Sequence, residues 1–177
     1  MQKGLLFYWP EMTFTMTAET ELTQLVEGLL PGPEYYVVAL EIKGREGGMQ
    51  KVQVLLDGDE GIGIDECSKV TRGLNAHLDE HPDLIPGKFI LEVSSPGVDF
   101  PLVGERRFRR NLGRSLKVLT TDGHELNGTL LEATADGISL KLDPVKTNKA
   151  AREAAEAAEP KQLSYQEIKT AIVQIKF

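Results

Sequence analysis

The sequence predicts an α+β protein in two parts, a three-stranded sheet with two helices followed by a small β-barrel. Two observations lead to this fold class. Up to about residue 94, the hydrophobic pattern changes in the order helix, strand, strand, helix, strand. Beyond that point, short apolar runs follow one another closely, with Asp-Gly turns between them. The length of 177 residues suits one medium domain or two small ones of about 90 residues each.

The first part begins with a helix over residues 17–30. Thr17 can cap its N-terminus, and a Pro-Gly-Pro run ends it. Its apolar residues recur at the spacing of one helix face: Leu22, Leu25, Val26, Leu29 and Leu30. Residues 35–42 are rich in Tyr and Val, and polarity alternates over residues 49–56. Both patterns predict strands, which a glycine-rich hairpin loop joins.

A second helix is predicted over residues 66–80, with Asp65 as its N-cap. Its buried stripe consists of four residues: Cys67, Val70, Leu74 and Leu78. A His-Pro pair ends the helix, and apolar residues alternate again over residues 88–93. Three strands can therefore bury one face of a sheet under two helices.

The second part begins with a short basic helix over residues 104–111. Strands are predicted over residues 114–120, 125–134, 137–142 and 170–177. Residues 143–162 are rich in Ala, Glu and Lys but have no large apolar stripe, so we expect an exposed helix or a mobile insertion there. The predicted organisation is an N-terminal arm at 1–16, an α/β domain at 17–97, and a barrel domain at 98–177 with its insertion at 143–162.

The composition excludes several classes of protein. Cys67 is the single cysteine, so neither an internal disulfide nor a structural zinc site can form. No apolar run approaches the roughly 20 residues that span a bilayer, and we expect no membrane partner and a cytoplasmic location. We interpret residues 1–16 as an extra arm, or as the result of a start codon assigned too early, with Met12 or Met16 as the true start.

Charge divides the chain unequally. The net charge is −7, yet the first 98 residues carry 7 basic and 16 acidic residues. Positive charge gathers in one stretch with no acidic residue: Arg106, Arg107, Arg109, Arg110, Arg114 and Lys117. Arginine forks match the geometry of phosphate, so this cluster is a candidate nucleic-acid site. The equally weighted alternative is a solvated inter-domain helix with Phe108 in the core and some arginines paired to the acidic first domain.

Other candidate sites are rejected on their residues. The turn around Gly61 and Gly63 lacks the third glycine of a dinucleotide site, and Asp57 and Asp59 do not continue into a complete calcium loop. The three histidines give no clear ligand set, and Cys67 is interpreted as a structural thiol. We therefore predict no catalytic residue, no cofactor, no metal and no enzymatic activity.

Residues 91–102, with the sequence LEVSSPGVDFPL, closely resemble the signature of the bacterial ribosome maturation factor RimP family. Residues 61–67, 108–114 and 168–171 also resemble family segments, so the resemblance covers about 35–177. Phe100 stands where the family usually has arginine. If that arginine contacts RNA, the nearby arginines of this chain would have to replace it.

The resemblance implies an α/β domain followed by an SH3-like or Sm-like barrel. It also implies a non-enzymatic assembly factor that binds the immature small (30S) ribosomal subunit. The implied partner is 16S rRNA or a small-subunit protein near the decoding region, bound by a monomer. The alternative is a general Sm-like RNA-binding module, and an enzyme using Ser94, Ser95 or Asp99 is least favoured.

The signature segment is predicted to be a rigid joint between the domains. Its residues are Ser94, Ser95, Pro96, Gly97, Asp99 and Pro101. The prolines fix φ, Gly97 can adopt positive φ, and Asp99 can accept backbone N–H groups in the bend. We expect the six cations of the basic stretch to bind the ribosome.

Overall fold

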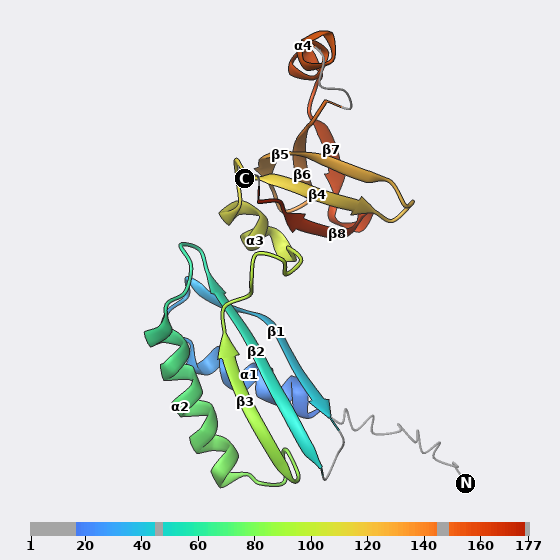
Figure 1. Cartoon of the computed structure of the whole chain (residues 1–177). Coiled ribbons are helices and arrows are strands. Elements are labelled where there is room, and N and C mark those ends of the chain that lie inside the picture. Colours follow the sequence, from blue (N-terminus) through green and yellow to red (C-terminus); the bar gives the residue numbers. More distant parts are fainter. Residues whose placement is uncertain (1–16, 45–47, 145–148, 176–177) are drawn as a thin grey trace, which may run out of the picture.

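A computed structural model describes residues 17–44, 48–144 and 149–175. Two sheets form, each with its own hydrophobic core, and the short helix α3 (Gly104–Arg110) lies between them (Figure 1). The predicted α+β class is therefore confirmed. The arm predicted at residues 1–16 lies outside the described residues. Within the described ranges, none of the helices combines the length and apolarity that crossing a bilayer requires.

The first sheet has the strand order β1-β2-β3. Strand β1 (Tyr35–Gly44) is antiparallel to β2 (Met49–Gly58), and β3 (Lys88–Ser94) is parallel to β2. The helices α1 (Ala18–Leu29) and α2 (Ile64–Glu80) pack against this sheet. One core joins sheet and helices: Leu22, Val26, Val52, Val54, Leu56, Val70, Leu74, Leu78 and Ile85.

The helix starts test two predicted caps. The Thr17 hydroxyl accepts the N–H of Thr20, which confirms the predicted cap of α1. The prediction of Asp65 as the N-cap of α2 is wrong, because the helix begins at Ile64 and Gly63 is its N-cap. The Glu66 carboxylate reaches back 3.1 Å to accept the Gly63 N–H, so the third helical residue satisfies this donor. Cys67 is half-buried, less than its place on the stripe predicts.

The second sheet is antiparallel throughout, in the order β7-β6-β5-β4-β8, an arrangement compatible with a small barrel. Its elements are α3 (Gly104–Arg110), β4 (Ser115–Thr120), β5 (Glu125–Ala133), β6 (Gly137–Leu142), β7 (Lys161–Ser164), the 3₁₀ helix η1 (Tyr165–Glu167) and β8 (Ile168–Val173). Its core consists of Leu102, Phe108, Leu116, Val118, Leu130, Ala133, Ile138, Leu140, Leu163, Ala171 and Val173.

The Ala-rich insertion contains a helix, α4 (Lys149–Ala157), without a buried residue, as predicted for an exposed helix (Figure 1). The insertion ends earlier than predicted, because β7 begins at Lys161 and pairs with β6. Only Leu163 of this four-residue strand is buried, so no alternation revealed it in the sequence. The last strand begins at Ile168, two residues before its predicted start.

Candidate functional site

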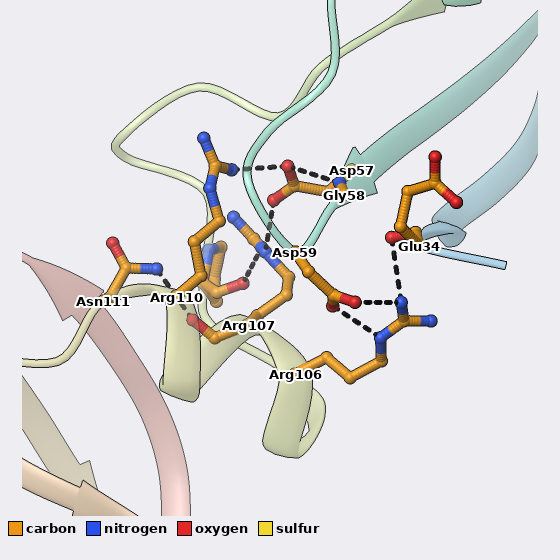
Figure 2. A network of polar contacts seen from close by, with 9 residues as sticks. Glu34, Asp57, Gly58, Asp59, Arg106, Arg107, Arg110 and Asn111 are labelled. Atoms are coloured by element: carbon orange, nitrogen blue, oxygen red, sulfur yellow. Dashed lines mark hydrogen bonds and ion pairs between the residues drawn. The ribbon is translucent and has the colours of Figure 1, made fainter. Parts of the chain in front are cut away.

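Helix α3 carries most of the predicted basic cluster and is anchored in the second core. Phe108 is 1% exposed, and its ring centroid lies 5.6 Å from that of Tyr165. Gly104 opens the helix with a φ of +77°, a conformation that glycine adopts without strain. With Phe108 facing the second core, Arg106, Arg107 and Arg110 reach the opposite way, toward the first sheet (Figure 2).

Asp57, near the end of β2, is the centre of these contacts. Its side chain is 1% exposed, and its Oδ1 accepts the N–H of Gly58 at 2.9 Å. The same oxygen accepts a short hydrogen bond from Nη1 of Arg110. Arg107 Nε lies 3.5 Å from Oδ2 of Asp57, an ion pair without hydrogen-bond geometry. A buried carboxylate is thus shared by two arginines of α3.

Arg107 is also buried, with 6% of its side chain exposed. Its Nη1 donates to the carbonyl of Pro101 at 2.8 Å, and its guanidinium carbon lies 5.5 Å from the ring centroid of Phe100. The Asn111 amide donates to the Arg107 carbonyl at 2.7 Å. Burial lowers the pKa of Arg107, and the charge of Asp57 opposes that shift. Arg107 therefore connects the signature segment, α3 and the first sheet.

Arg106 makes a second bridge at the edge of the same contact. Its Nε and Nη2 donate to the two carboxylate oxygens of Asp59 at 2.8 and 2.7 Å. Its Nη2 also donates to the carbonyls of Pro33 and Glu34, and its guanidinium lies 4.4 Å from the Tyr36 ring centroid. The hydrogen bond from Arg106 lowers the pKa of Asp59 and raises that of Arg106. This bidentate pair is half-exposed, so each bond contributes less than at Asp57.

The remaining predicted cations make no ion pair or side-chain hydrogen bond with the first sheet among the described residues. Arg109 is exposed, and its Nε lies 3.2 Å from the carboxylate of Glu105. Lys117 is paired with Glu125 at 2.9 Å. Arg114 is exposed and makes no ion pair or side-chain hydrogen bond with any residue that the structure describes. The six cations thus divide into three at the joint and three at the surface.

The signature segment bends differently from the prediction. The Phe100 N–H donates to the Gly97 carbonyl at 3.0 Å and closes a turn. Gly97 does not use positive φ, and over the described ranges no backbone N–H donates to the exposed Asp99 carboxylate. A contact from outside the segment is made at its end, where Arg107 donates to the Pro101 carbonyl.

Sequence reasoning raised the pairing of some arginines with the acidic first part but did not identify the partners. By their spacing in the sequence, Asp57 and Asp59 fit only a turn or an incomplete calcium loop. Arg106 and Asp59 are 47 positions apart, and Arg110 and Asp57 are 53 apart. The one available signal was an acidic turn at the end of a strand, opposite in charge to a short basic helix.

Fold and site together define a class of small α+β protein in which two separate cores are held together by arginines of one short helix. Residues 25–99 match the model of the RimP N-terminal domain. The ribosome maturation factor RimP of Cytophaga hutchinsonii is 32% identical over 163 residues, which cover 90% of this chain and 97% of that protein. The ribosome maturation factor RimP of Chlorobium chlorochromatii is 40% identical over 108 residues, 59% of this chain and 60% of that protein. The chain belongs to the ribosome maturation factor RimP family.

Proposed function

We propose that this protein binds the immature small (30S) ribosomal subunit in the cytoplasm and assists its maturation as a monomer, without catalysing a reaction. Its relatives are ribosome maturation factors by name, which supports a role in ribosome assembly. The subunit, the location and the non-enzymatic role are our inference. We also place the boundary between two domains at residues 97 and 98, in the segment that follows the end of β3 at Ser94.

The observation that carries the proposal is the division of the six cations. Arg106 and Arg107 are engaged within the protein, so their first role is to fix α3 against the first sheet. Arg109 and Lys117 are in exposed pairs, which are weak enough for a phosphate to replace the carboxylate. Together with Arg114, which has no partner among the described residues, we take them as the basic surface of the second half of the chain. The acidic first half suits a basic ribosomal protein instead.

Co-sedimentation with immature and mature small subunits tests this function. We expect the protein to sediment with immature subunits in preference to mature ones. Replacing Arg109, Arg114 and Lys117 by Gln should weaken that binding. The slope of log affinity against log salt concentration should become less steep by about 2 to 3, because each phosphate contact contributes about 0.7 to 0.9. A matched variant removes equal charge elsewhere by replacing the exposed Arg72, Lys88 and Arg152 by Gln.

Each outcome has a distinct meaning. Absence of sedimentation with immature subunits contradicts the proposed function. Equal behaviour of the two triple variants removes the surface cations from the binding site. Tighter binding to free RNA than to the subunit favours the alternative, a general Sm-like RNA-binding module.

A further inference from the structure

A small polar cavity of about 100 Å³ lies where the signature segment meets the C-terminal end of α3. The segment around Gly97 forms one wall. The other wall carries the side chains of Arg107, Arg110, Asn111 and Arg114. A Cβ added at Gly97 would meet no atom within 4 Å, so that wall is open. The volume suits a group of a few heavy atoms.

The charges around this cavity do not balance. Three arginines line the cavity, and no acidic residue is among its lining residues. Asp57, which does not line it, forms ion pairs with two of these arginines, Arg107 and Arg110. Asp57 engages only Nη1 of Arg110, and Arg114 has no partner among the described residues. An excess of about two positive charges therefore faces a restricted volume, which attracts an anion.

Arg107 supplies an independent observation. Its side chain is 6% exposed, and its Nε lies 3.5 Å from Oδ2 of Asp57 without a hydrogen bond. One buried carboxylate is thus shared by two arginines, and an anion in contact with the same guanidinium would offset the remaining positive charge. The helix end contributes carbonyls, which repel anions, so the arginine side chains must supply the attraction.

We propose that this cavity binds a phosphate group of the RNA backbone through the side chains of Arg107, Arg110 and Arg114, which line it. Guanidinium forks match the oxygens of a phosphodiester. The inference rests on the proposed function, since it assigns the RNA contact of the same basic surface to a defined site. It gives Arg114 a role in recognition and none in holding the two sheets together.

Titration with inorganic phosphate, followed by NMR of the arginine Nε–Hε groups, tests the cavity directly. We expect saturable shifts for Arg110 and Arg114, with little change at the exposed Arg72. Arg114→Gln should abolish the saturable shift at Arg110, whereas Arg72→Gln should leave it unchanged. Equal, non-saturating shifts at Arg72 and Arg114 would show unspecific charge attraction and overturn the proposal.

A fluorescent single-stranded RNA of ten nucleotides tests the source of the phosphate. Arg114→Gln should lower the steepness of the logarithmic salt dependence by about 0.7, the value for one contact with a single strand. Arg72→Gln is the control and should not change it. An unchanged slope in Arg114→Gln, or tighter binding of adenosine diphosphate than of the RNA, overturns the assignment to the RNA backbone.

The two proposals fail separately. Loss of the phosphate-dependent shifts, with sedimentation on immature subunits intact, rejects the cavity and leaves the function. Saturable binding of phosphate and RNA, without sedimentation on immature subunits, rejects the function and leaves the cavity as an RNA-binding site. Arg114→Gln serves both experiments because it removes no contact within the described protein.

Discussion

Asp57 is the residue whose loss should weaken the protein most. Its carboxylate is buried and faces two arginines, one of them also buried. Asp57→Asn leaves the charge of Arg107 without a counter-ion, which costs about 3–5 kcal/mol in comparable buried pairs. Asp59→Asn, at the half-exposed pair, should cost much less, because solvent screens that pair. Urea denaturation of the two variants measures the difference.

A double variant identifies the cause of that loss. Adding Arg107→Met to Asp57→Asn removes the unpaired buried charge and replaces it with an apolar side chain. Part of the lost stability should therefore return, although both variants lack the ion pair. If the double variant is less stable than Asp57→Asn alone, the packing of Arg107 matters more than its charge.

Asp122 offers a pH-dependent observable at the residue scale. A hydrogen bond from the Thr120 hydroxyl, together with bonding to His124, lowers the pKa of Asp122 from 3.8 to about 2. The folded value lies below the unfolded one, so the stabilisation is present above about pH 4 and is lost as the pH falls through 2. NMR titration of the carboxyl carbon should show this midpoint, and Thr120→Val should raise it. Thr121→Val is the neighbouring control, and a wild-type midpoint near 4 would contradict the assignment.

At the scale of elements, the approach of β5 to β6 depends on a glycine. A Cβ at Gly128 would lie 2.4 Å from the Lys141 carbonyl oxygen, a backbone atom that cannot move alone. Gly128→Ala should therefore destabilise the protein by about 1–3 kcal/mol.

Gly28→Ala in α1 should instead stabilise the protein. A Cβ at this position meets no atom within 4 Å, and alanine favours helix by about 0.5–1 kcal/mol. Denaturant midpoints compare both, and destabilisation by Gly28→Ala would refute the helix argument.

The elements show which features a single sequence predicts. The stripe through Leu22 and Val26 predicted α1, and alternation through Val52, Val54 and Leu56 predicted β2, because local periodicity reports directly which face is buried. β7 is too short to show a period and depends on its pairing with β6. The start of α2 was misplaced because Asp65 is a good cap by type, whereas the Glu66 carboxylate satisfies the Gly63 N–H.

The candidate site was less predictable than the fold, because its contacts connect distant parts of the chain. The basic cluster was visible in the sequence, and so were both of its interpretations. The burial of Phe108 in the second core fixes which face of α3 is directed toward the first sheet. This packing therefore decides which arginines pair with the first sheet and which stay exposed. The acidic partners Asp57 and Asp59 follow only from the placement of β2 opposite that helix. Charge pattern predicts a partner's sign but not its position.

For the molecule as a whole, the arginine contacts make a prediction about the placement of the two sheets. Phe108 ties α3 to the second core, while Arg106, Arg107 and Arg110 reach the first sheet. At 1 M salt the screening length is about 3 Å, so the exposed Arg106 pair should weaken while the buried contacts at Asp57 persist. The two sheets should therefore tumble together at both low and high salt.

Amide ¹⁵N relaxation measures this by giving a rotational correlation time for each sheet. In the wild-type protein the times for the two sheets should agree at 0.1 M and 1 M salt. In Asp57→Asn they should become shorter and differ, because the buried link is lost and the joint then depends on the chain from Ser95 to Val103 and on the contacts of Arg106 at the edge. Asp59→Asn is the matched control, and its times should agree at 0.1 M salt. Equal times in Asp57→Asn would instead mean that the proline-containing signature segment fixes the two sheets by itself, with the ion pairs secondary.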